Sequence, residues 1–196
     1  MFAGAPGALA ADPFAVRVQR EIYAVLPFQR GVFFLSDEQR TPLLLYGETS
    51  SPTECRQNAA FKMNGDVGTI AVSACPEHVA RLRSATAANQ RGFEATLDSL
   101  QKGIPAPIPD DKLRAIGWYY DRSTVAGGEL HYFPILLIGH GVLAVPTVIL
   151  LTDRQAVVAQ ASTTHLCGDR IDAHPLCADP RGTLGAIARR VLAAFP

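Results

Sequence analysis

The chain contains one long uncharged segment, residues 131–151, in which no Asp, Glu, Lys or Arg occurs. Its 21 residues would be enough to cross a bilayer as a helix. However, Pro134 and Pro146 each remove a backbone hydrogen-bond donor, and glycines flank His140 at the centre. The other residues are rich in Val, Ile, Tyr, Phe and Thr, which favour strands. The segment therefore predicts two buried β-strands joined at residues 139–141, and no membrane span.

Further strands are expected on both sides of this pair. The predicted strands are residues 116–122, 129–138, 142–151 and 156–164. Because short connections join only antiparallel neighbours, they predict a four-stranded antiparallel meander. The two middle strands are apolar at successive positions, so both faces of the sheet must be covered by helices, another sheet or a partner.

Three helices are predicted. The first and the last begin at Asp12-Pro13 and Asp179-Pro180, because each pair offers a capping residue followed by proline. The longest runs from Pro76 towards Lys102, with a break expected at Gly92. Its predicted core stripe consists of Val79, Leu82, Phe93, Leu97 and Leu100.

Two hairpins are expected between the first two helices. Their strands are residues 31–36 with 42–47, and residues 60–63 with 69–73. The chain is therefore predicted to be an α+β protein, with a mostly antiparallel sheet (hairpins plus a meander in the C-terminal half) packed by about three helices.

The length of 196 residues is most simply read as one domain, residues 12–196. The Pro-rich segment Gly103–Asp111 is predicted to be an extended connection within it. Residues 1–11 are predicted to be a signal-peptide remnant or a disordered N-terminus. Ala8-Leu9-Ala10 has the small-residue pattern of a signal-peptidase site, but a basic start is missing.

Charge and composition exclude one class of partner. Basic and acidic residues both total 18, so no net field attracts nucleic acid, and no nucleic-acid partner is expected. Arg outnumbers Lys by 15 to 3 in an Ala-rich chain, which is typical of high-GC bacterial genomes.

The four cysteines allow three connectivities, and the two local pairs, Cys55–Cys75 and Cys167–Cys177, are predicted to be disulfides. Each would stabilise the fold by about 3 kcal/mol. The alternative is four reduced thiols in a cytosolic protein. A zinc site of His165, Cys167, His174 and Cys177 is a second alternative, but its ligand spacing is too tight, and no metal is predicted.

Cys75-Pro76-Glu77-His78 follows an apolar strand and begins a helix. This resembles the active-site turn of thioredoxin-like proteins, with His78 in place of the second cysteine. Val145-Pro146-Thr147 is similar to the cis-proline loop of that superfamily. The resemblance implies a thiol-active protein in which Cys75 is the reactive group and His78 its neighbour. The missing second cysteine and the missing helix before Pro146 depart from the pattern.

Aromatic and polar side chains gather on the first two meander strands. The predicted binding residues are Trp118, Tyr120, Arg122 and His131, with His140 as a candidate ligand group at the sheet end. No Gly-x-Ser-x-Gly, Walker or His-Glu-x-x-His motif occurs, so the chain is not expected to be an enzyme, and no cofactor is predicted.

These observations favour an exported, disulfide-stabilised bacterial protein, periplasmic or extracellular, that binds another protein. An inhibitor, an immunity protein or an envelope accessory protein would fit, and self-association is a further expectation. The alternative is a divergent thioredoxin-like envelope protein, and a third hypothesis is a small-molecule pocket near His140.

Overall fold

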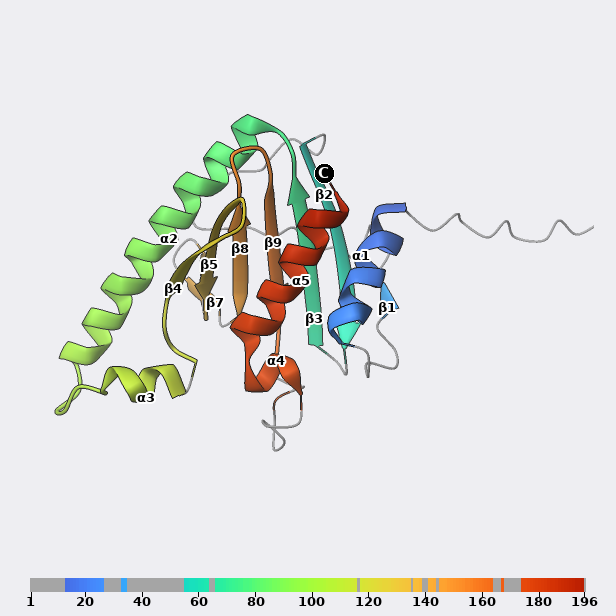
Figure 1. The fold of residues 1–196 in the computed structure, drawn as a ribbon. Helices are drawn as coiled ribbons and strands as arrows, with labels where there is room; N and C mark the ends of the chain where they lie inside the picture. The colour runs from blue at the N-terminus through green and yellow to red at the C-terminus, as the bar shows by residue number, and fades with distance from the viewer. Residues whose placement is uncertain are drawn as a thin grey trace, which may run out of the picture.

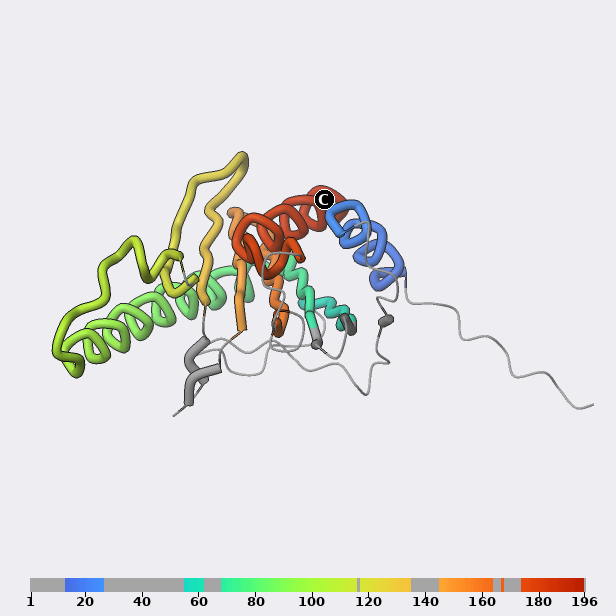
Figure 2. Tube along the Cα trace, turned by 90° about the horizontal axis from the view of Figure 1, so that it is seen from below, coloured from blue at the N-terminus to red at the C-terminus, as the bar shows by residue number. Residues whose placement is uncertain are grey.

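The computed structural model describes residues 13–26, 33–34, 55–63, 66–115, 117–134, 136–138, 141–143, 145–163, 167 and 174–195. A central sheet has helices on both faces (Figure 1). Helices α1 (Pro13–Val25) and α5 (Pro180–Ala194) cover one face, and α2 (Pro76–Lys102) covers the other, as the view from below shows (Figure 2). The predicted α+β class is confirmed.

The main sheet has seven strands in the order β1-β2-β3-β9-β8-β5-β4, and every pairing is antiparallel. Their bounds are β1 Phe33–Phe34, β2 Arg56–Met63, β3 Asp66–Ser73, β4 Asp121–Val125, β5 Gly128–Phe133, β8 Thr147–Leu151 and β9 Ala156–Ala161. The predicted pair of strands 60–63 and 69–73 is confirmed as β2 and β3, and both strands are longer than predicted. The other predicted hairpin lies outside the described residues except at β1, which pairs with β2.

The meander is confirmed as the neighbouring strands β4, β5, β8 and β9, with two corrections. Its first strand begins at Asp121 rather than at residue 116. The two long middle strands are each interrupted, so that β6 (Leu136–Ile138) and β7 (Gly141–Leu143) form a separate two-stranded sheet.

Proline explains the interruption. The last pair of the β5–β8 ladder is Phe133 with Thr147, so the next pair would place Pro134 opposite Pro146. Neither proline has a backbone N–H to donate, and the ladder ends there. The two halves of the uncharged segment still pair with each other as predicted, since Ile138 pairs with Gly141.

Two hydrophobic clusters hold the layers together, and the side chains of each strand alternate between them. Leu130, Tyr132, Val148 and Leu150 point towards α1 and α5. Phe133, Ile149 and Leu151 point towards α2. The prediction that both faces of the meander are covered is thereby confirmed for the described residues, and the cover comes from the chain itself.

The three predicted helices begin where the sequence indicates. The helical structure departs from the prediction in two respects. Helix α2 is continuous, so the break expected at Gly92 is wrong. Two short helices, α3 (Asp110–Ala115) and α4 (Pro175–Ala178), were not predicted. No helix in the described part of the chain is long and apolar enough to span a membrane.

Candidate functional site

The four cysteines form two disulfide bonds, and both are the predicted local pairs. Cys55, which precedes β2, is bonded to Cys75, which precedes α2, with their Cα atoms 5.3 Å apart. This bond ties the beginning of a sheet strand to the beginning of the longest helix. Cys75 is therefore a half-cystine in this state. Its partner is Cys55, because the thioredoxin-like turn that begins at Cys75 has no second cysteine of its own.

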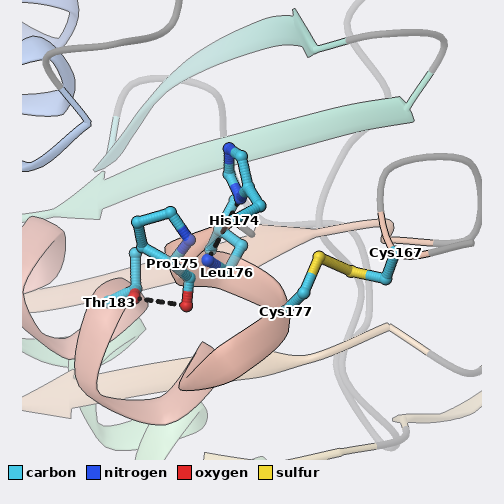
Figure 3. Close-up of a disulfide and its surroundings, with 6 residues drawn as sticks. All are labelled: Cys167, His174, Pro175, Leu176, Cys177 and Thr183. Atoms are coloured by element: carbon cyan, nitrogen blue, oxygen red, sulfur yellow. Dashed lines mark hydrogen bonds between the residues drawn. A yellow bond between two sulfur atoms is a disulfide. The ribbon is translucent and has the colours of Figure 1, made fainter. Parts of the chain in front are cut away.

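The second disulfide joins Cys167 to Cys177 in α4 (Figure 3). His174 caps this short helix, since its Nδ1 accepts a hydrogen bond of 3.1 Å from the backbone N–H of Leu176. Thr183 in α5 donates a hydrogen bond of 2.9 Å to the carbonyl oxygen of Pro175. His174 thus has a structural role, the two sulfurs are bonded to each other, and His165 lies outside the described residues.

The thioredoxin-like resemblance does not extend to a shared site. Ser73 and Leu151 both pair with Ala156, so Cys75 lies near the end of the sheet where β8 finishes. Pro146 precedes Thr147 at the opposite end of β8. The two features are therefore about a full strand apart, roughly 16 Å.

Three of the predicted binding residues come together on the α2 side of the β4–β5 hairpin. The hydroxyl of Tyr120 lies 2.9 Å from Nδ1 of His131, and Nε2 of His131 lies 3.4 Å from Oε2 of Glu129. Arg122, whose direct partner across the hairpin is His131, donates diagonally to Glu129. Glu129, which the sequence analysis does not single out, links His131 to Arg122. The place of Glu129 in this cluster could have been predicted from the hairpin, because Glu129 and His131 are two residues apart on one strand and therefore share a face.

Burial sets the protonation states of this cluster. His131 is only 6% exposed, and burial lowers its pKa below the ordinary value of 6.5, although the Glu129 carboxylate opposes this shift. Burial likewise raises the pKa of Tyr120 to about 12. At neutral pH both rings are therefore uncharged, and the Tyr120 hydroxyl can donate to Nδ1. The contacts of the cluster tie the two strands of the hairpin together.

The opposite side of the same hairpin is also anchored. A guanidinium nitrogen of Arg181, in the first turn of α5, lies 2.5 Å from Asp121 and donates to the hydroxyl of Ser123 at 3.2 Å. The ring of Tyr119 packs on that of Tyr132, with centroids 5.2 Å apart. The chain returning from α3 is thus held against the core.

The other predicted binding residues have different environments. Trp118 is half-buried, and its backbone N–H donates to the carbonyl oxygen of Leu113 at 2.8 Å. The side chain of Arg122 is 56% exposed. His140 lies outside the described residues. A recognition patch built on Trp118 and Arg122 stays a prediction, whereas Tyr120 and His131 face the protein interior.

A second candidate surface lies where α2 extends beyond the sheet (Figures 1 and 2). We define the tip as residues 98–111, which comprise the last turn of α2, the connecting loop and the start of α3. It exposes Leu100, Ile104 and Ile108 by 50%, 37% and 41%. Leu100 was predicted to be a core residue. This prediction is wrong, because α2 extends beyond the edge of the sheet that it covers.

The tip is held in a defined shape. The side chain of Gln101 donates to the carbonyl oxygen of Ile108 at 2.8 Å and accepts from its N–H at 2.7 Å. The backbone N–H of Gly103 closes the helix on the carbonyl oxygens of Ser99 and Leu100. Three prolines also restrict the loop, at positions 105, 107 and 109. Exposed apolar side chains on a preorganised loop lose little entropy on binding.

We expect the stability of the fold to fall as the pH drops from 7.5 to 5.5. The pKa of His131 in the folded state is below 6.5, so the unfolded chain binds the proton more readily in this range. His131→Gln should reduce the difference between the urea midpoints at the two pH values.

The control for this pH effect is His174→Gln, since burial also lowers the pKa of His174. His131 is enclosed by Tyr120 and Glu129, whereas His174 is half-buried, so we expect the His131 variant to show the larger reduction. An unchanged pH dependence in His131→Gln would contradict the assigned environment.

Comparison with known proteins adds no family. No protein-family model matches the chain, and no curated protein or solved structure matches it significantly.

Proposed function

We propose that this protein works in an oxidising compartment, periplasmic or extracellular, and binds another protein through its tip. An inhibitor, an immunity protein or an envelope accessory protein would act in this way. The observation that carries the proposal is the tip itself, an ordered projection that displays three large apolar side chains to solvent.

The two disulfides support the choice of compartment. Disulfides form and persist in secreted and periplasmic proteins, whereas cytosolic reductants keep thiols reduced. All the cysteines of the chain are paired. Acid quenching of cells followed by alkylation would show the state in vivo, and four free thiols would contradict this part of the proposal.

The tip also indicates the chemistry of the partner. Leu100, Ile104 and Ile108 require an apolar pocket to bury them. Asp110 and Asp111 are exposed beside Ile108, while Asp98 is neutralised by Lys102 at 2.6 Å. The partner surface is therefore an apolar pocket with a basic rim next to the Ile108 side.

The proposal is tested by site-specific photo-crosslinking in cells that produce the full chain. A benzophenone amino acid replaces Leu100 in one variant and Val16 of α1 in a matched control, because Val16 is 49% exposed on another element. We expect a discrete protein adduct at Leu100, and Ile104→Asp in the same chain should abolish it. No adduct at Leu100, or the same adduct at Val16, would contradict a binding role for the tip.

A further inference from the structure

We infer that Cys55–Cys75 is an exchange site for dithiols, at which an attacking thiolate bonds to the Cys55 sulfur and Cys75 leaves. This inference does not depend on the function proposed for the tip. It concerns a bond that joins β2 to α2 at the end of the sheet opposite to Pro146.

Cys75 lies where its thiolate would be stabilised. It is the N-cap residue of α2, a helix of 27 residues, and its side chain makes no capping hydrogen bond while the sulfur is bonded to Cys55. The first N–H groups of a helix have no partner within it. A released Cys75 thiolate could accept from the amides of Glu77 or His78, and the helix dipole would stabilise its charge.

Two other helix starts in the described chain are capped by side chains and offer no such place for a thiolate. Asp179 caps α5 by accepting from Gly182 at 2.8 Å, and His174 caps α4. Cys177 lies within α4, which has four residues, and so gains no comparable stabilisation as a thiolate. Cys55 and Cys75 are half-buried, as are Cys167 and Cys177, so residue exposure does not separate the two bonds and the helix start does.

Exchange with a dithiol takes two displacements at sulfur. The first thiolate of a dithiol bonds to Sγ of Cys55, the Cys55–Cys75 bond breaks, and its electron pair leaves on the Cys75 sulfur. The second thiol of the reagent then displaces Cys55 and closes a disulfide within the reagent. Two electrons pass from the dithiol to the protein, and two protons follow to Cys55 and Cys75. A leaving thiolate that is better stabilised leaves faster, which sets the direction of attack.

The test uses the folded, oxidised protein with two probes. The dithiothreitol concentration is raised until one disulfide bond opens. The free thiols are then alkylated, and the labelled cysteines are identified by mass spectrometry. We expect Cys55 and Cys75 to be labelled before Cys167 and Cys177. Reduced glutathione in place of dithiothreitol should be trapped on Cys55 rather than on Cys75, in about threefold excess or more.

A pair of variants separates helix stabilisation from simple accessibility. Glu77→Gln removes a negative charge from the first turn of α2 and should speed opening, whereas Glu94→Gln, further along the same helix, should not. Circular dichroism would confirm that both remain folded. Earlier opening of Cys167–Cys177, equal trapping on the two sulfurs, or equal effects of the two substitutions would overturn the inference.

Discussion

Replacing Phe133 with alanine is expected to lower the free energy of unfolding by about 3–5 kcal/mol. The side chain is fully buried in the cluster between the sheet and α2, and its ring lies 5.0 Å from that of Tyr120. Its removal leaves a cavity at the last pair of the β5–β8 ladder, next to the position where two prolines prevent further pairing. Urea unfolding followed by circular dichroism at pH 7.5 would measure the loss.

The matched control is Val16→Ala on the exposed side of α1, which should change the stability by no more than about 0.5 kcal/mol. The Phe133 variant should also have a weaker pH dependence between 7.5 and 5.5, since Tyr120 loses a neighbour and His131 becomes more hydrated. If Phe133→Ala lowered the free energy of unfolding by less than about 1 kcal/mol, this face of the sheet would not be packed as described.

The second large effect is expected from removal of the Cys55–Cys75 bond. The double change Cys55→Ala with Cys75→Ala should cost about 3 kcal/mol, because the bond closes a loop of 20 residues and restricts the unfolded chain. The same change at Cys167 and Cys177, which lie 10 residues apart, should cost slightly less by the same argument.

Full reduction provides the control for both disulfide variants. Reduced wild-type protein and the reduced double variant should unfold at similar urea concentrations, because the difference between them lies in the covalent bond. A double variant as stable as the oxidised wild type would contradict a structural contribution from Cys55–Cys75.

Much of the fold follows from local signals in the sequence. Asp179-Pro180 predicts the start of α5, and the structure shows Asp179 capping that helix. The short loops predict antiparallel neighbours, and β4, β5, β8 and β9 are neighbours in that order. The local cysteine pairs were predicted because each closes a loop that contains Gly, Asp or Asn, and both pairs form.

The interruption of the meander was harder to predict. It depends on the register that places Pro134 opposite Pro146, and register is a tertiary property. α3 and α4 were missed because helices of six and four residues give too little periodicity to detect.

The candidate sites were only partly predictable. The sequence pattern predicted aromatic and charged residues on adjacent strands. It could not show that Tyr120 and His131 face inwards towards α2. The overhang at the tip could have been predicted from length. A helix of 27 residues is about 40 Å long, whereas a strand of eight residues spans about 27 Å, so the last turns of α2 extend beyond the sheet.

If the tip is a protein-binding surface, the affinity of the crosslinked partner must depend on the side chains of the tip. Isothermal titration calorimetry of the purified partner would compare the wild type, Ile104→Asp and the surface control Val16→Asp. We predict that Ile104→Asp weakens binding at least about tenfold, since a charge would enter an apolar pocket, and that Val16→Asp binds like the wild type. Equal affinity of Ile104→Asp and the wild type would contradict the claim.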